Sequence, residues 1–218
     1  MITVNWKVTE NYLPNQAIAK QLAKCQFPTT KYYDYERQAR VPYNCDSKDE
    51  DVLASGLCIF HDENYLKEDK DNRKEREQKV KEKLMDKVRK SVDQKEALFC
   101  IGYHLPDIPL EEVNFTKPVY FTNCEFQGAA DFRSARFIKE TNFNSAKFSG
   151  QAASFYSAKF SGEAYFSDAT FSGEAYLIRA TFSGEASFSQ ATFSGETSFN
   201  SATFAKEASS IIQISKTR

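Results

Sequence analysis

An 11-residue repeat occupies residues 113–204, and it restricts the possible folds of the chain more than any other feature. Large apolar residues recur in it at spacings that alternate between five and six. One spacing is seven, from Phe148 to Phe155, which we interpret as a one-residue insertion at Gln151 and Ala152. A small residue, usually Ala, precedes each large one by two positions. The column of large residues comprises Phe115, Phe121, Phe126, Phe132, Phe137, Phe143, Phe148, Phe155, Phe160, Phe166, Phe171, Leu177, Phe182, Phe188, Phe193, Phe199 and Phe204.

This periodicity fits neither an α-helix nor a simple hairpin sheet. Steps of five and six residues rotate by about 140° and about 240° around an α-helix, so the Phe side chains would scatter over its surface. The many Gly, Ser and Thr residues oppose a helix as well, and in a flat strand a step of five changes the face. We therefore predict a β-solenoid whose interior receives both the large and the small column. Its Ser-Gly-Glu segments predict corners at which Gly takes a positive φ.

The repeats resemble the pentapeptide-repeat family, whose motif Ala-x-Leu/Phe-x-x is seen here in Ala191-Thr-Phe193 and Ala164-Tyr-Phe166. The resemblance implies a right-handed four-sided β-helix with the Phe column stacked inside as a structural ladder. Two of the repeat units make one coil, which is longer than the coil of the family because alternate corners carry an extra residue. About four coils are expected, each adding roughly 4.8 Å to the tower. The resemblance also implies a homodimer through the C-terminal coil and a prokaryotic cytoplasm.

Some members of this family mimic DNA and act on topoisomerases, which requires a strongly acidic tower. Residues 113–204 hold eight acidic and seven basic side chains, so this tower lacks the charge of a polyanion. Glu163 and Glu185 are two repeat units apart, as are Glu174 and Glu196, and each pair is expected to stack at one corner. We interpret them as solvated corner residues, with cation binding as the alternative.

Changes in composition divide the chain into an N-terminal Cys/His module (1–61), a charged helix and joint (62–110) and the solenoid (111–218). Residues 62–96 carry 11 acidic and 12 basic side chains. An apolar residue recurs there every four positions, which predicts a helix over 64–95 that packs on the first coil or on the N-terminal module. The stripe consists of Val80, Leu84, Val88 and Val92.

The helix and both ends of the solenoid need capping residues. Asp62 is expected to be the N-cap of the helix. An end coil has no neighbour, so we expect Phe99–Leu110 to cap the solenoid at its N-terminal end. At the other end the candidates are Ile211, Ile212 and Ile214.

A second pattern is a Cys/His cluster formed by Cys25, Cys45, Cys58 and His61. Three Cys and one His are a common ligand set for structural zinc, and a Cys-x-x-His pair can close a chelate on one ion. The segment 25–61 is poor in aliphatic residues, so a metal would help to order it. The gaps before Cys45 and Cys58 are longer than in standard zinc fingers, and three reduced thiols in a loosely packed module are the alternative.

Composition restricts the function. The chain has 218 residues, a net charge of −1, five Cys and two His. An odd Cys count fits reduced thiols or a metal site in the cytoplasm, and no apolar run is long enough to span a membrane. We find no nucleophile–base pair, phosphate loop or open metal site, so we expect no enzyme. The expected function is a scaffold that binds another protein. The alternative is a nucleic-acid-related protein, through either the Cys/His module or topoisomerase-directed mimicry.

Overall fold

The computed structural model describes residues 25–28, 30–34, 39–47, 51–67, 71–205, 208–209 and 213–214. An antiparallel hairpin of β1 (Thr30–Asp34) and β2 (Ala39–Tyr43) comes first, followed by helix α2 (Arg73–Gln94) and then by the solenoid. Residues 1–24 and the expected capping residues Ile211 and Ile212 lie outside the described residues. Within the described part of the chain, no helix is long and apolar enough to cross a membrane.

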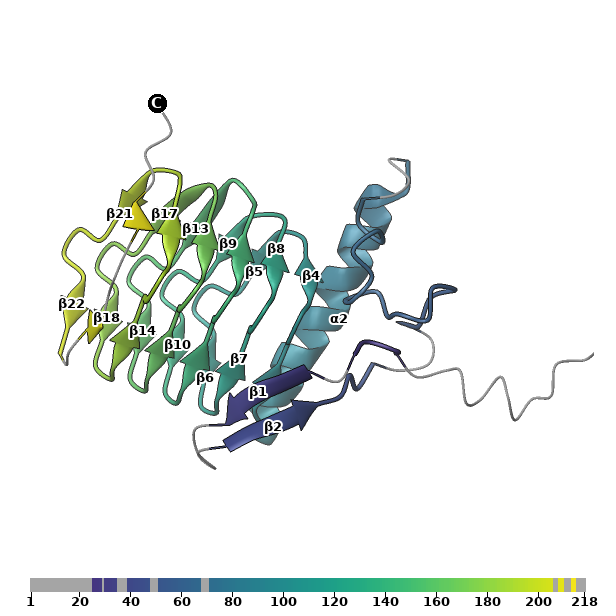
Figure 1. Ribbon diagram of the computed structural model, residues 1–218, viewed down its shortest axis with the longest axis horizontal. Helices are drawn as coiled ribbons and strands as arrows, with labels where there is room; N and C mark the ends of the chain where they lie inside the picture. The colour runs from purple at the N-terminus through teal and green to yellow at the C-terminus, as the bar shows by residue number, and fades with distance from the viewer. Residues whose placement is uncertain are drawn as a thin grey trace, which may run out of the picture.

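The prediction of a four-sided β-solenoid is confirmed: short parallel strands form four sheets, and about five coils stack along one axis (Figure 1). The first sheet contains β3 (Leu98–Phe99), β7 (Val119–Tyr120), β11 (Thr141–Asn142), β15 (Ala164–Tyr165), β19 (Ala186–Ser187) and β23 (Ala208–Ser209). The second contains β4 (His104–Leu105), β8 (Glu125–Phe126), β12 (Lys147–Phe148), β16 (Thr170–Phe171), β20 (Thr192–Phe193) and β24 (Gln213–Ile214).

The remaining two sides of the coil are sheets of five strands. One contains β5 (Ile108–Pro109), β9 (Ala130–Asp131), β13 (Ala152–Ser154), β17 (Glu174–Tyr176) and β21 (Thr197–Ser198). The other contains β6 (Asn114–Phe115), β10 (Arg136–Phe137), β14 (Lys159–Phe160), β18 (Thr181–Phe182) and β22 (Thr203–Phe204). The coil therefore remains four-sided although it is longer than the coil of the family.

The Phe column fills the interior as a ladder of parallel rings. The ring of Phe148 lies 4.4 Å from that of Phe171, and Phe171 lies 4.6 Å from Phe193. Both pairs are stacked within 5° of parallel, because each residue pairs in register with its counterpart one coil away. The rings are buried except at the last coil, where Phe199 is half-buried and Phe204 is 39% exposed.

Two kinds of corner alternate, and one expectation about them was wrong. Where the Phe spacing is five, the positive φ falls on a residue other than Gly, as at Asp168 (φ 57°), and the amide of Ala169 donates to the carbonyl of Phe166. Where the spacing is six, Gly173 has no positive φ. Its α-carbon instead packs against the backbone of Gly150 and Gln151 in the coil below, leaving no space for a side chain. Gly is thus required here for close approach of the coils.

The solenoid begins one coil earlier than its repeats indicate. Leu98 pairs with Val119, and Leu105 pairs with Phe126, so residues expected as a joint and cap form the first coil. This coil is slightly shorter than those that follow it, as the sequence separations of paired strands show. By the register of the strands, it carries Cys100, Leu105 and Leu110 where the next coil has Phe121, Phe126 and Phe132. One side of it packs on helix α2 rather than on another coil.

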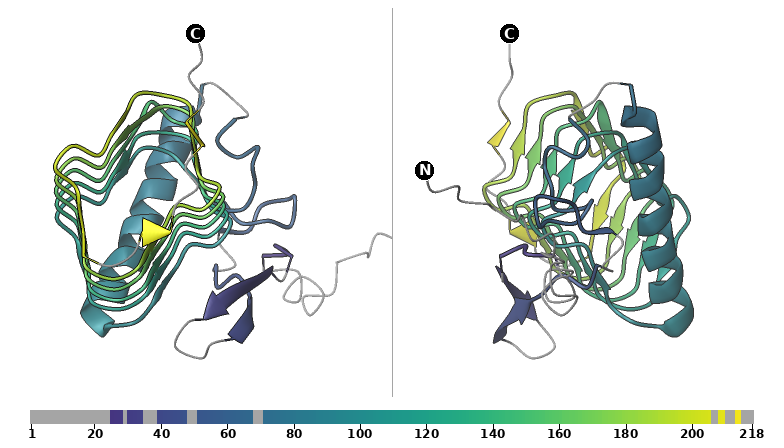
Figure 2. Two further views of the ribbon diagram at one scale, coloured as in Figure 1. Left: turned by 60° about the vertical axis from the view of Figure 1, so that its left-hand side comes forward. Right: turned by 90° about the vertical axis from the view of Figure 1, so that its right-hand side faces the viewer.

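Helix α2 lies across the N-terminal end of the solenoid (Figure 2). Its Val80, Leu84 and Val88 are buried in the same core as the coils, as the stripe predicts. The helix begins at Arg73 after Asn72, so the expected start near residue 64 was wrong. Asp62 is no helix cap: its carboxylate accepts hydrogen bonds from the amide of Asn64 and the hydroxyl of Ser55, because residues 62–67 form successive turns.

Candidate metal centre

Four side chains from three separate segments meet beside the first coil. The ligand atoms of Cys25, Cys45, Cys58 and His61 all lie within 4.8 Å of one another. The sulfurs of Cys45 and Cys58 are 3.7 Å apart, and His61 Nδ1 is 3.4 Å from the sulfur of Cys25 and 3.2 Å from that of Cys58.

These separations fit a tetrahedral metal ion. With Zn–S bonds of about 2.3 Å and Zn–N bonds of about 2.0 Å, tetrahedral ligands lie about 3.8 Å apart for two sulfurs and about 3.5 Å for sulfur and nitrogen. The observed distance between the Cys45 and Cys58 sulfurs is 3.7 Å, and the distances from His61 Nδ1 to sulfur are 3.2 and 3.4 Å. The ligand set and the separations therefore fit zinc.

The ligands come from both ends of the hairpin and from one tight turn. Cys25 precedes β1, and Cys45 follows β2. Cys58 and His61 lie in a turn in which the amides of His61 and Asp62 both donate to the carbonyl of Cys58. The amide of Cys58 donates to the sulfur of Cys25 at 3.2 Å, so the first segment is fixed against this turn.

The imidazole of His61 is oriented by contacts on its other side. It is 4% exposed, and its Nε2 lies 3.0 Å from the carbonyl oxygen of Ile101 in the first coil. Since a carbonyl can only accept, Nε2 carries the proton and Nδ1 is left with a lone pair toward the sulfurs. The ring of Phe27 stacks on the imidazole at 3.8 Å and covers its face.

Each thiol sulfur accepts a hydrogen bond from the amide two residues further along the chain. Phe27 donates to Cys25, Ser47 to Cys45 and Phe60 to Cys58. Amide donors of this kind stabilise negative charge on sulfur, which is the form of Cys that binds metal. The backbone around the centre is thus arranged for three thiolates.

The thiols influence one another and differ in burial. A hydrogen bond from Cys58 is the main reason that the pKa of Cys45 is lowered to about 3. The hydrogen bond between Cys45 and Cys58 is the main cause that raises the pKa of Cys58, and burial is the second. Burial also raises the pKa of Cys25. Three thiolates this close repel one another, and a divalent cation among them would offset that repulsion.

The other candidate residues lie apart from this centre. His104 Nδ1 is 3.0 Å from a carboxylate oxygen of Glu125, one coil away on the second sheet. Cys124 occupies the small column of the repeat, where its thiol donates to the carbonyl of Cys100, and both are fully buried. Five free cysteines thus divide into three at the centre and two in the solenoid core.

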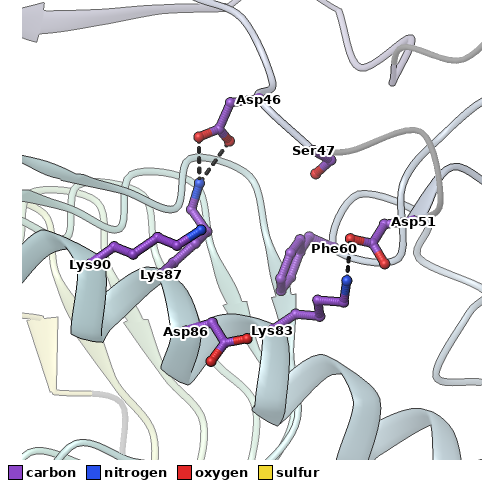
Figure 3. A pocket seen from close by; sticks show the side chains of 8 residues that line it. All are labelled: Asp46, Ser47, Asp51, Phe60, Lys83, Asp86, Lys87 and Lys90. Carbon is purple, nitrogen blue, oxygen red and sulfur yellow. Dashed lines mark hydrogen bonds and ion pairs between the residues drawn. The ribbon is translucent and has the colours of Figure 1, made fainter.

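Sequence reasoning missed how lysines of helix α2 hold the loops around the centre. Lys87 lies 2.7 Å from Asp46, the residue after Cys45, and Lys83 lies 3.2 Å from Asp51, which is 4% exposed (Figure 3). These pairs line a cavity of about 160 Å³ between the helix and the loops. The lysines recur every four residues on one helix face, a signal hidden by the many other charges in this segment.

In a comparison with known proteins, a family model matches the solenoid part of the chain. A family model described as Pentapeptide repeats (9 copies) matches residues 110–152, 134–181 and 177–209. Searches of curated proteins and of solved structures returned no match. The hairpin, the metal centre and helix α2 lie outside the matched residues.

Proposed function

The chain is a pentapeptide-repeat protein over residues 110–209, and from this we propose that it is a non-catalytic scaffold whose N-terminal module is held in place by a structural zinc ion. The observation that carries the proposal is the ligand set of the centre. Cys25, Cys45, Cys58 and His61 bring four ligand atoms within 4.8 Å of one another, and the three separations of 3.7, 3.4 and 3.2 Å are close to those of a tetrahedral site. A catalytic zinc site keeps one position for water or substrate, and four protein ligands leave none.

Zinc is the metal that these residues favour. Thiolates and imidazole are soft or borderline ligands, which exclude magnesium and calcium as preferred ions. Zinc would bind here through the sulfurs of Cys25, Cys45 and Cys58 and through Nδ1 of His61, and it would supply crosslinking rather than redox chemistry.

The crosslink would join the hairpin to the solenoid. Cys25 and Cys45 flank the hairpin, whereas His61 is tied to Ile101 of the first coil and the carbonyl of Phe60 accepts from the amide of His104. The hairpin rests on the outer face of the first sheet, where the ring of Tyr32 lies 4.9 Å from that of Tyr120. Tyr43 of β2 is buried in one cluster with Ile101 and Tyr120, and Phe27 and Tyr32 pack against this cluster. We infer that the metal adds a crosslink to this apolar contact and so fixes the ends of the hairpin.

The solenoid would present its flat outer faces to another protein. Parallel sheets stacked in register give rigid surfaces that need no further ordering when a partner binds. We place this function in the cytoplasm, because a reducing compartment keeps the five free cysteines in the thiol form.

A second copy of the chain is the partner that we propose for the C-terminal coil. Phe204 is 39% exposed there, and β21 and β22 are the last strands of their sheets among the described residues. Light scattering of the purified chain should give the mass of a dimer, and Phe204→Glu should give that of a monomer. If the unmodified chain has the mass of a monomer, this part of the proposal is contradicted.

The zinc proposal is tested by metal analysis of the full chain purified under reducing conditions. We expect about one zinc per chain. Removal by a chelator should increase hydrogen exchange at hairpin amides, while the amides between coils stay protected. Cys124→Ala is the matched control, because it removes a thiol from the solenoid and leaves the four ligands intact. Protein that contains no zinc and takes none up would refute the proposal.

A further inference from the structure

We propose that the centre is an oxidation-sensitive latch: a peroxide joins Cys45 and Cys58 in a disulfide, the metal leaves, and the N-terminal end of the hairpin detaches from the first coil. This inference rests on the proposed function, because it requires a metal at the four ligands. It adds a regulated change of state to a site that otherwise would only be structural.

The positions of the two sulfurs support this pair. They are 3.7 Å apart, so little movement is needed to bring them to bonding distance. Cys45 is half-buried, and the two residues that follow it, Asp46 and Ser47, line the cavity beside helix α2. Cys58 is fully buried. Of the two sulfurs in this pair, a small oxidant would therefore meet Cys45 first, with Cys58 3.7 Å away.

The chemistry balances with hydrogen peroxide as the oxidant. The Cys45 thiolate attacks one peroxide oxygen, the O–O bond breaks, and hydroxide leaves to give a sulfenic acid. The Cys58 thiolate then attacks the Cys45 sulfur, the S–O bond breaks, and a second hydroxide leaves as the S–S bond forms. Two sulfurs lose two electrons in total, and the peroxide is reduced to two hydroxide ions, which take up protons from the buffer to give water.

Loss of two thiolates would release the metal. A disulfide sulfur is neutral, and the thiolate is the form of Cys that holds zinc. Cys25 and His61 would remain, and two ligands do not retain a structural zinc ion.

The two ends of the hairpin would respond differently. Cys45, at the end of β2, would stay joined covalently to Cys58, whereas Cys25 would lose its link to the other ligands. The amide of Gln26 donates to the carbonyl of Gly56 at 2.8 Å, and this hydrogen bond reports on the N-terminal end. Release of that end would move Phe27 off the imidazole of His61, on which its ring now stacks at 3.8 Å. The latch would thus control access to the imidazole of His61, which is now 4% exposed.

The experiment treats the zinc-loaded full chain with hydrogen peroxide in the presence of a chromogenic chelator. We expect loss of about one zinc per chain. The peptides that contain Cys45 and Cys58 should be linked, with a combined mass about 2 Da below the sum of the two reduced peptides. Hydrogen exchange should increase at Gln26, while the amide of Cys100, which donates to Tyr120 in the next coil, stays protected. Dithiothreitol with added zinc should reverse all three changes.

Two variants make the experiment specific. Cys124→Ala, which changes a buried thiol of the solenoid, should release zinc at the rate of the unmodified chain. Ser47→Ala keeps all four ligands but removes a hydroxyl that lies 3.1 Å from the Cys45 sulfur, and it should change the rate of release. An unchanged rate in Ser47→Ala would contradict Cys45 as the sulfur that is attacked first.

The outcomes separate this inference from the proposed function. Zinc that stays bound in peroxide, or a disulfide that joins Cys25 to either partner, would overturn the latch and leave the structural zinc site standing. A chain that binds no zinc would overturn both.

Discussion

His61 donates a hydrogen bond from Nε2 to the carbonyl oxygen of Ile101 at 3.0 Å, although the two residues are far apart in sequence. This bond connects the Cys/His centre to the first coil of the solenoid and leaves Nδ1 facing the three sulfurs. A metal ion held there would couple the order of the N-terminal module to an intact first coil.

The first prediction concerns His61 as a ligand. His61→Gln should lower zinc affinity by at least about 100-fold, because it removes the only nitrogen ligand of the four. Cobalt(II) substitution, followed by visible absorption, measures both the affinity and the tetrahedral geometry. His104→Gln is the matched control, since the second histidine pairs with Glu125 on the solenoid and should keep normal affinity. Equal losses in both variants would argue against the assigned ligand set.

The second prediction concerns the Phe ladder. Phe166→Ala should lower the free energy of unfolding by about 3–5 kcal/mol, because the cavity lies between stacked rings that cannot move together to fill it. The ring is fully buried and stacks on Phe143 and Phe188 at 4.9 and 4.8 Å. Urea unfolding of the metal-loaded chain measures the change. Glu163→Gln, an exposed change in the same coil, should alter it by less than about 0.5 kcal/mol.

The third prediction separates the two kinds of corner. Gly173→Ala should destabilise the solenoid by about 1–3 kcal/mol, since the new methyl group meets the backbone of the neighbouring coil. Asp168→Gly, at a corner with φ 57°, should change stability by less than about 1 kcal/mol, because relief of backbone strain offsets the extra freedom of the unfolded chain. Thermal unfolding of the two variants side by side checks this, and the reverse order of stability would refute the distinction.

The fourth prediction concerns the anchor between helix α2 and the metal-binding loops. Lys83→Met should cost about 1–3 kcal/mol, because Asp51 is almost fully buried and loses its closest cation at 3.2 Å. Lys74→Met, an exposed change on the same helix, is the control and should be close to neutral. Differential scanning calorimetry gives the values. A Lys83 variant as stable as the control would show that Lys79, at 4.0 Å, is a sufficient partner for Asp51.

The sequence by itself determined the solenoid, because each coil repeats the same packing problem. A large ring at one position and a small residue two before it must recur wherever coils stack, so the spacing of Phe126, Phe132 and Phe137 already predicts a β-solenoid. Its four sides were implied by the resemblance to the pentapeptide-repeat family rather than by the spacing. The residue types Cys25, Cys45, Cys58 and His61 likewise suggested a ligand set, although not its geometry.

Only the tertiary structure decided the rest, for reasons that are not local. The first coil carries few Phe residues, and its membership follows from pairing Leu98 with Val119 rather than from any motif. The Gly corners depend on the backbone of the next coil, which lies a full coil away in sequence, so the sequence suggested a positive φ where close approach was the cause. The meeting of Cys25 with His61 depends on the hairpin folding back over the first sheet, and long-range docking of this kind leaves no periodic signal in the sequence.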